Sequence, residues 1–452
     1  MISAIGLAGG LALLILLTVR GVNILIAAPA CALLVALSSG VALLPPLAAE
    51  GAPDFATAYM RGFTGFFADW FLMFLLGAIF GEVMAASGAA DSVARWVVRT
   101  FGVKRAAVAV VLACAALTYG GVSVFIVAFS VYPMAVGLFR EADLPRRFIP
   151  GALAFGSVTF TMTSAGSPEI QNLIPMPFLG TTAYAAWEAS LVVAIVMAAI
   201  GFLWLARMIR RAVARGERFV PRLGDEAARE EKALPHPLLA TAPLVAVLAV
   251  FLVLQYPENA PSFMAPLLPE VSLGKYALLG ALAAGTLVAM LVGAKGAKRF
   301  PSAFSTGASG AVVAIVNTCA VVGFGSIARL APAFETALAA LQTLPGDPLI
   351  GAAIAVTVIA GLTGSASGGQ TIALPLIAPH YLGLGVDPNE LHRVVALSSG
   401  ALDSLPHNGY VVTTIRAICG ETHKDAYGAV FALTVIIPLL GVALAIAIFS
   451  VT

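Results

Sequence analysis

Charged residues are scarce in this chain of 452 residues, because Asp, Glu, Lys and Arg make up only 11% of it. An ordinary soluble protein carries about 25% charged residues, which cover its surface. Hydrophobic residues make up 60% of the sequence, and they occur in runs long enough to span a bilayer. The composition therefore excludes a soluble enzyme, a nucleic-acid-binding protein and a secreted disulfide scaffold, and it indicates a polytopic membrane protein.

Cysteine is rare as well, and the four cysteines lie far apart in the sequence, without the spacing of metal ligands or of a disulfide framework. We interpret them as small hydrophobic residues of packed helices. The sequence contains no Walker A motif, so it does not support an ATP-driven pump. We expect no metal and no other cofactor. The first apolar run, 2–19, lacks the flanks of a cleavable signal peptide and is predicted to be the first span.

The apolar segments form two series with the same order of features. Each series contains three spans, a short amphipathic helix, an interrupted hairpin, an interrupted span and a last span. The first series comprises 2–19, 22–44, 63–87, 89–103, 106–139, 147–180 and 184–206. The second comprises 238–257, 276–293, 303–328, an amphipathic stretch at Phe334, 349–384, 391–418 and 427–450.

This shared order predicts an internal duplication. The first repeat covers 1–206 and the second covers 238–452. Between them, 207–237 holds eight basic and five acidic residues, which predicts a solvated linker. The predicted fold class is an all-α polytopic membrane protein with two inverted repeats, each with five crossing helices, one re-entrant hairpin and one broken helix.

The distribution of charge predicts the orientation of the chain. With the N-terminus outside, all Lys and Arg residues lie on the inner side except Arg61, Lys275, Arg329 and Arg393, as the positive-inside rule requires. We therefore expect a multi-pass protein of a bacterial-type inner (plasma) membrane, with both termini outside and the linker in the cytoplasm. If each hairpin crossed the membrane completely with two spans, the same Lys and Arg residues would lie inside. The distribution of charge therefore does not distinguish the two cases, and we predict re-entrant hairpins from their glycine-rich tips.

Four interruptions place polar groups at membrane depth. A broken helix exposes backbone N–H groups at one half-helix start, which attract a carboxylate, and carbonyl groups at the other end, which can hold a cation. The two hairpin tips offer glycines and hydrogen-bonding side chains at Thr118, Gly120, Gly121, Ser123, Ser365, Ser367, Gly368 and Gln370. The alternative for both tips is close helix–helix packing of small residues.

The two broken spans contain ionisable residues, which are functional candidates at membrane depth. Glu169 could carry a coupling proton, or it could sit at the outer water boundary. Asp403 and His407 could exchange that proton, or they could form a structural pair that stabilises the break. Asn317 could line a cavity or bond to a neighbouring helix. His236, His392 and His423 fall at membrane edges, where we expect them to be solvated.

One short pattern is typical of an enzyme. Gly307-Ala308-Ser309-Gly310 matches the GxSG sequence of intramembrane serine proteases. It lies near the predicted inner edge, and patterns of four small residues are common in membrane helices. We therefore do not predict an enzyme, although a hydrolase at Ser309 remains an alternative.

Two segments resemble a known family, namely SPEIQNLIP at 167–175 and SGALDSLPHNG at 399–409. They are similar to segments of the gluconate:proton symporter family, and most similar to its D-beta-hydroxybutyrate permease-like members. That family belongs to the ion transporter superfamily. The resemblance implies two inverted repeats divided into scaffold and transport domains, homodimers, and elevator-type alternating access.

The resemblance also implies where the substrate binds. Residues that fall where the superfamily holds its carboxylate are Ser123, Ser164, Ser167, Ser365, Ser367, Ser399, His407 and Asn408. The tips lack the Ser-Asn-Thr sequence of the sodium-coupled dicarboxylate branch, which favours protons as the coupling ion. The predicted function is proton-coupled symport of a small organic monocarboxylate such as 3-hydroxybutyrate or gluconate, with Asp403, His407 and Glu169 as proton-coupling candidates. The alternatives are a sodium-coupled carboxylate symporter and an anion channel.

Overall fold

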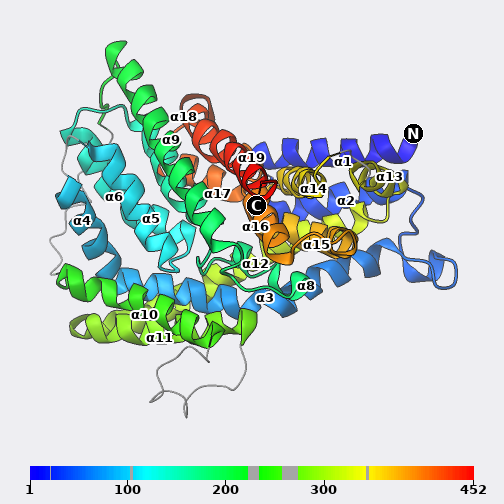
Figure 1. Cartoon of the computed structure of the whole chain (residues 1–452), viewed down its shortest axis with the longest axis horizontal. Helices are drawn as coiled ribbons and strands as arrows, with labels where there is room; N and C mark the ends of the chain where they lie inside the picture. Colours follow the sequence, from blue (N-terminus) through cyan, green and yellow to red (C-terminus); the bar gives the residue numbers. More distant parts are fainter. Residues whose placement is uncertain (21, 102–104, 222–233, 257–272, 343–345, 452) are drawn as a thin grey trace.

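The computed structural model describes residues 1–20, 22–101, 105–221, 234–256, 273–342 and 346–451, and over these ranges the protein is helical without β-strands (Figure 1). Five helices are long and apolar enough to cross a membrane: Phe55–Ala86 (α3), Trp187–Ala214 (α9), Pro237–Gln255 (α10), Ala297–Ala328 and His423–Phe449. The fourth contains α12 (Phe300–Ala328), and the fifth joins α18 (His423–Phe431) to α19 (Ile437–Phe449). The protein is therefore an all-α polytopic membrane protein, as predicted.

Long helices pack in pairs around the centre of the molecule. The helix α3 lies along α12, α10 lies along α11 (Ala277–Val292), and α1 (Ile2–Val19) lies along α2 (Ile24–Ser38). Figure 1 shows α3, α10 and α11 running beneath the other helices. Two amphipathic helices, α4 (Ala89–Phe101) and α13 (Pro332–Gln342), occupy the predicted positions.

Both predicted hairpins form, and each turns at a glycine. The first joins α5 (Ala106–Tyr119) to α6 (Val124–Glu141), and the second joins α14 (Pro348–Thr363) to α15 (Ala366–Gly383). Gly121 has φ +88° and Gly364 has φ +60°, in the left-handed region that strongly favours glycine. In Figure 1 the two hairpins lie on opposite sides of the molecule, with α16 and α17 between them.

Both predicted breaks are also present. In the first, α7 (Ile149–Ala154) and a π-helical turn (Phe155–Thr159) end before an irregular segment that leads to α8 (Met176–Leu179). In the second, α16 (Pro388–Ser399) and α17 (Gly409–Val412) flank the irregular segment 400–408, and a further π-helical turn (Thr413–Ile418) follows. Pro168 and Pro406 lie within these irregular segments, where a proline lacks the N–H that a regular helix needs.

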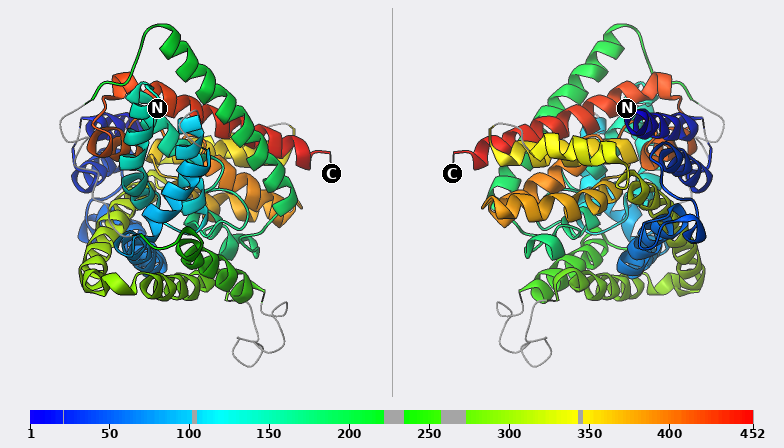
Figure 2. Two further views of the ribbon diagram at one scale, coloured as in Figure 1. Left: turned by 90° about the vertical axis from the view of Figure 1, so that its left-hand side faces the viewer. Right: turned by 90° about the vertical axis from the view of Figure 1, so that its right-hand side faces the viewer.

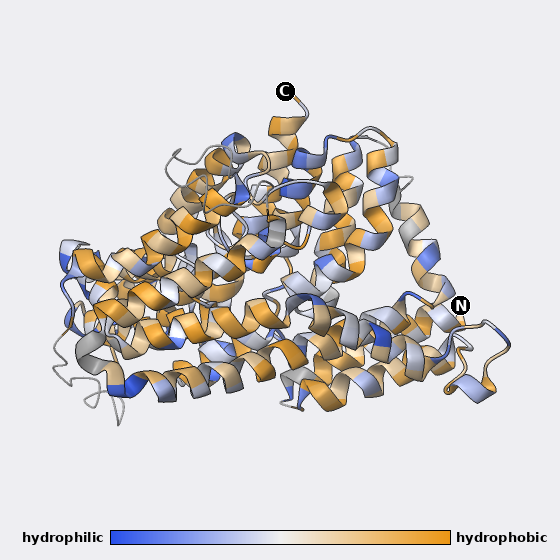
Figure 3. Ribbon diagram, turned by 90° about the horizontal axis from the view of Figure 1, so that it is seen from below, coloured by the Kyte–Doolittle hydropathy of each residue, from blue (hydrophilic) through white to orange (hydrophobic). Residues whose placement is uncertain are grey.

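The outer faces of several helices are apolar, as expected where lipid replaces water. Exposed side chains include Ile195 and Leu203 on α9, Val245 on α10, and Leu287 and Leu291 on α11. Figure 3 shows hydrophobic residues along the helices, with hydrophilic residues gathered mostly at helix ends and connections.

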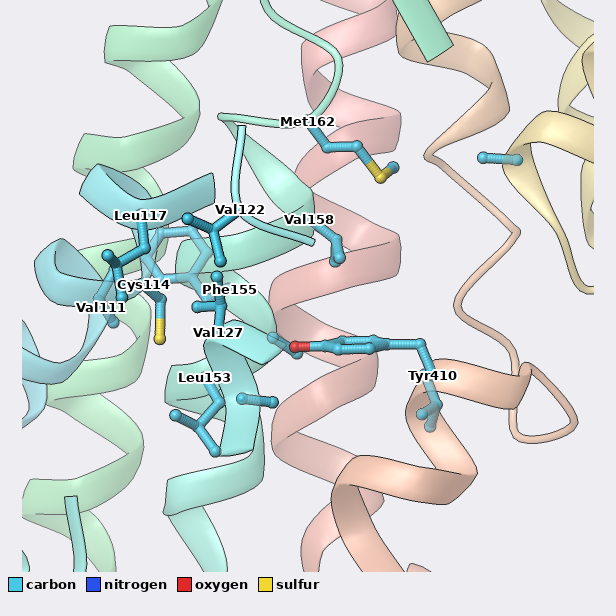
Figure 4. Packing of buried hydrophobic residues seen from close by; sticks show 14 of the residues in the cluster. Val111, Cys114, Leu117, Val122, Val127, Leu153, Phe155, Val158, Met162 and Tyr410 are labelled. Atoms are coloured by element: carbon cyan, nitrogen blue, oxygen red, sulfur yellow. The ribbon is translucent and has the colours of Figure 1, made fainter. Parts of the chain in front are cut away.

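The interior is packed with small and aliphatic side chains. Val111, Cys114 and Leu117 of α5 belong to the same buried cluster as Phe155 and Tyr410 (Figure 4). All four cysteines are buried and free, in agreement with the interpretation as small hydrophobic residues.

Some predicted boundaries need correction. The helix α9 continues to Ala214, so the beginning of the predicted linker 207–237 is helical, and α9 projects beyond its neighbours in Figure 2. The rest of that prediction partly falls on 222–233, outside the described residues. The helix α2 ends at Ser38 rather than at 44, because Gly40 adopts φ +71° and two prolines follow at 45 and 46.

Candidate functional site

A cavity of about 330 Å³ lies between the two hairpin tips and the two breaks. The helices α3, α11 and α12 complete its wall, together with single residues of α1 and α2. All four predicted interruptions therefore contribute to one cavity.

The first tip presents the start of α6 to this cavity. Ser123 precedes the helix, lines the cavity and makes no side-chain hydrogen bond to the first turn. The amides of that turn have no intrahelical acceptor, and its residues Val124 and Phe125 also line the cavity. Gly121 holds the turn against the first break, because a Cβ there would lie 3.3 Å from Pro168 Cγ.

The second tip presents the start of α15 in the same manner. The Ser365 hydroxyl accepts a hydrogen bond from the Gly368 amide at 3.1 Å, and it lies 3.3 Å from the Ser367 hydroxyl. This cap leaves the amides of Ala366 and Ser367 without an intrahelical acceptor, and both residues line the cavity.

The second break locks onto the second tip. The Asn408 side-chain amide donates to the Gly364 carbonyl at 3.0 Å, and its carbonyl oxygen accepts from the Val411 amide at 2.9 Å. The His407 ring lies over Gly364, so that a Cβ at this glycine would approach Cδ2 to 2.6 Å. Both contacts keep His407 and Asn408 at the cavity wall.

Two buried ionisable groups of the second break line the cavity. Asp403 is 6% exposed and accepts a hydrogen bond from the Ser404 hydroxyl at 3.0 Å. His407 is 5% exposed, and neither ring nitrogen forms a hydrogen bond of good geometry within the described chain. His407 is therefore a buried polar side chain whose hydrogen-bonding capacity is not used up within the described chain.

The first break contributes Glu169 and Gln171 to the cavity wall. Its backbone is tied to the first tip, because the Tyr119 hydroxyl donates to the Ala165 carbonyl at 2.6 Å. The Ser164 hydroxyl does not reach the cavity lining and donates instead to the Phe160 carbonyl at 2.6 Å.

The structure divides the predicted site residues into two groups. Those that line the cavity are Gly121, Ser123, Glu169, Ser365, Ser367, Asp403, His407 and Asn408. Those outside the lining are Thr118, Gly120, Ser164, Ser167, Gly368, Gln370 and Ser399.

Several members of the second group have structural contacts. The Gln370 side-chain amide donates to the Ser399 hydroxyl at 2.8 Å and to the Gln171 carbonyl at 3.1 Å, which joins the second hairpin to both breaks. Gly120 packs on Leu244 of α10, which a Cβ would approach to 2.7 Å. The absence of a side chain at Gly120 allows this close packing.

Other cavity residues were not among the predicted binding residues. Gln171, Thr363 and Ser404 are immediate neighbours of the predicted motifs. Asn317 and Thr318 of α12 also line the cavity. Of the two interpretations of Asn317, the structure supports the one in which it lines a cavity. Ser309 is not part of this lining.

One prediction about the second broken span was wrong. His392 is not solvated but fully buried, and its Nδ1 lies 2.6 Å from the Thr181 hydroxyl. Arg393, which the distribution of charge places on the outer side of the membrane, is also fully buried. Both residues lie on α16, which the irregular segment of the first break covers.

The electrostatic character of the cavity is mixed. Its described lining contains two carboxyl groups, Glu169 and Asp403, and no Lys or Arg side chain. The positive ends of two helices, α6 and α15, open into the same space. Another part of the lining is apolar, with Met73 and Phe74 of α3 and Leu278 and Leu282 of α11. The described residues hold no cluster of three or more His, Cys, Asp and Glu side chains that could bind a metal.

Comparison with known proteins identifies similar transporter sequences and similar solved structures. An uncharacterized transporter of Bacillus subtilis, YxjC, is 37% identical over 98% of both chains. An uncharacterized transporter of Haemophilus influenzae is 24% identical over 80% of this chain and 78% of that protein. The crystal structure of the YdaH transporter of Alcanivorax borkumensis is similar with a TM-score of 0.58 and 16% identity, over 96% of this chain and 98% of that chain. At this identity the likeness shows the fold alone. No family model matches the chain.

Proposed function

We propose a function from one premise: this chain belongs to the family of membrane transporters that includes YxjC of Bacillus subtilis. Within that family, the chain is a secondary active transporter that carries a small organic monocarboxylate together with a proton. The observation that carries this proposal is the composition of the cavity wall. Two helix starts, the buried His407 ring and two carboxyl groups line it, without a Lys or Arg side chain in the described lining.

Binding of the substrate carboxylate is assigned to the helix starts. The first-turn amides of α6 and α15 are fixed donors with a partial positive charge, and the hydroxyls of Ser123, Ser365 and Ser367 replace the hydrogen bonds of water. Asn408 lies beside them at the second break. This arrangement binds an anion without lysine or arginine.

Proton coupling follows from the charges that would share the cavity. A bound carboxylate together with ionised Asp403 and Glu169 would place three negative charges in one space. Two like charges about 5 Å apart repel by about 3 kcal/mol at an effective dielectric constant of about 20. A proton on Asp403 or Glu169 removes this repulsion, and His407 is the third candidate for holding it.

The lining also bears on the size and polarity of the substrate. The apolar wall of Met73, Phe74 and Leu282, with Met162 nearby in the lining, offers no partners for a chain of hydroxyl groups. A 3-hydroxybutyrate-like acid has one hydroxyl and a methyl group, and it fits this wall better than gluconate. We therefore expect gluconate to compete weakly.

Further parts of the proposal concern the whole transporter. We propose two inverted repeats at 1–206 and 238–452, an elevator-type movement of the hairpins and breaks, a homodimer, and an inner-membrane location with both termini outside. Support comes from the order of segments in the two halves and from the positive-inside distribution of charge.

Uptake of labelled 3-hydroxybutyrate into proteoliposomes tests the proposed function. With an acidic exterior we expect accumulation above the external concentration, loss of it on addition of a protonophore, and no stimulation by a sodium gradient. Ser309→Ala, an exposed position outside the cavity lining, is the matched control and should transport normally. Sodium-driven accumulation would refute proton coupling, and gradient-dissipating flux without accumulation would indicate a channel.

A further inference from the structure

Arg393 is a buried cation with an unusual set of partners. It lies on α16, is fully buried, and belongs to the largest side chains that are completely enclosed. Its recorded partners are all neutral oxygen atoms, and they come from the first half of the chain. Burying a guanidinium group is costly unless every donor is satisfied, so its surroundings must be specific.

The geometry accounts for all five N–H groups of Arg393. Nε donates to the Ala185 carbonyl at 3.2 Å. Nη2 donates to the carbonyls of Ala183 at 3.3 Å and Ala185 at 2.9 Å. Nη1 donates to the Thr163 carbonyl at 2.5 Å and to the Asn172 side-chain oxygen at 2.8 Å. The planar fork of arginine can reach all these acceptors at once, which the single ammonium group of lysine cannot.

Asn172 extends this network through the first break. Its Oδ1 accepts from Arg393, and its Nδ2 donates to the carbonyls of Ser164 at 2.7 Å, Ser167 at 3.1 Å and Met162 at 3.4 Å. Asn172 is itself fully buried. Arg393 and Asn172 together therefore hold the irregular backbone of 162–172 in one shape.

That backbone carries part of the cavity wall. Pro168, Glu169, Ile170 and Gln171 lie between the carbonyls that Asn172 binds and Asn172 itself, and all four line the cavity. Backbone hydrogen bonds, such as the one from the Gly166 amide to the Ala183 carbonyl at 3.0 Å, fix part of the shape of this segment. The side chains of Arg393 and Asn172 bind further carbonyl groups that have no regular helical partner.

We propose that Arg393 is a positioning residue, which from the second half of the chain fixes the backbone of 163–172 and thereby sets how Glu169 and Gln171 face the substrate. It touches no cavity space itself, because it is absent from the described lining. The proposal rests on the function proposed above, since it assigns the consequence to substrate binding.

Arg393→Lys in the full-length protein tests this role, with Arg147→Lys as its matched control. Arg147 lies at the start of the first predicted broken span, as Arg393 lies near the start of the second, but Arg147 is about one-third exposed and pairs with Glu217 at 2.7 Å. We expect Arg393→Lys to raise the KM for 3-hydroxybutyrate about tenfold or more, with a smaller change in maximal rate, and Arg147→Lys to leave KM within about twofold. An unchanged KM in Arg393→Lys would overturn the proposal.

Hydrogen exchange provides a readout that does not require transport. In nanodiscs, the amides of Gly166, Ser167 and Asn172 should exchange about tenfold faster or more in Arg393→Lys, while that of Gly368 at the second tip keeps its rate. If the wild-type protein does not transport the acid, the proposed function is refuted, but the exchange rates still test the positioning role of Arg393. Uniform acceleration over the whole chain would instead show a general loss of stability and overturn the positioning role.

A second variant covers the possibility that Arg393→Lys does not fold. Asn172→Ala leaves Arg393 its three backbone acceptors, so the protein should fold with a smaller increase in KM. In the double variant, the increase should be less than the product of the two single effects, because both changes break the same network. Independent effects that multiply would contradict the proposed coupling between the two residues.

Discussion

Single residues decide the chemistry of this cavity, and Asp403 is the most informative of them. It is buried and lines the cavity, and its recorded hydrogen bond comes from Ser404, a neutral donor. If it carries the coupling proton, substrate binding must be stronger at low pH, where the carboxyl group is neutral. The same side chain as a structural partner would give no such pH dependence.

We therefore predict that Asp403→Asn changes the pH dependence of substrate binding. The amide imitates the protonated acid, so affinity for 3-hydroxybutyrate should become nearly constant between about pH 5 and pH 8, whereas in wild type it should fall as pH rises. The Asp403→Asn variant should also no longer accumulate 3-hydroxybutyrate above its external concentration. Titration of binding at several pH values measures this, and Glu335→Gln at an exposed position of α13 is the control. Wild-type pH dependence in Asp403→Asn would exclude Asp403 as the proton carrier.

Gly364 offers a test of the geometry of the second tip. Gly364→Ala should destabilise the protein by about 1–2 kcal/mol from the left-handed backbone alone, with a further cost because Cβ would displace the His407 ring. Thermal unfolding and uptake should both decline. Gly310→Ala, where a Cβ meets nothing within 4 Å, should be neutral or slightly stabilising. Equal effects of the two substitutions would contradict the contact with His407.

At the residue scale, sequence patterns located polar side chains in apolar segments but not their partners. His407, Asn408 and Asp403 were found because ionisable residues stand out at membrane depth. His392 was predicted to be solvated because its position at a span end is typical of solvated residues. Its burial, like that of Arg393, depends on a distant segment. Only tertiary structure brings the first break over α16.

At the scale of elements, the breaks and hairpin turns explain why the site exists where it does. Each hairpin turns at a glycine with positive φ, and each break contains a proline, so local sequence ends the helices near the cavity. These signals are local, which is why the order of spans, hairpins and breaks could be predicted. The pairing of helices and the contribution of α12 to the cavity could not, since they depend on long-range packing.

The segment after α9 carries an ion pair outside the membrane spans. Glu217 accepts two hydrogen bonds from Arg147, at 2.7 and 3.0 Å, and these bonds lower the pKa of the Glu217 carboxyl below its usual value of 4.5. A lowered pKa stabilises the folded state above pH 4.5, and this contribution disappears as the pH falls through the folded-state value. The pair thus tethers the end of α9 near neutral pH.

Glu217→Gln should therefore lower stability at pH 7 by about 0.5 kcal/mol, a small value because both side chains are about one-third exposed and solvent screens the pair. The difference from wild type should shrink below about pH 4.5. Chemical unfolding in detergent at the two pH values measures it. A difference that grows toward acid pH would contradict the direction of the pKa shift.

At the scale of the whole molecule, the proposed topology places Glu50 outside and Arg215 in the cytoplasm. Both are exposed, and the native cysteines are all buried, so introduced cysteines can be labelled against a low background. Glu50→Cys in intact cells should react with an impermeant maleimide, and Arg215→Cys only after permeabilisation. The opposite pattern would invert the orientation, and reaction of both in intact cells would refute the proposed sidedness.

The central claim is that a carboxylate binds between the tips of the two hairpins and the two breaks. The most direct measurement is a cryo-electron microscopy map of the protein in nanodiscs with saturating 3-hydroxybutyrate, compared with a map without it. We predict added density in contact with Ser123, Ser365 and Asn408, at the starts of α6 and α15. A map with the acid bound elsewhere, or with no density in this cavity at saturation, would contradict the account.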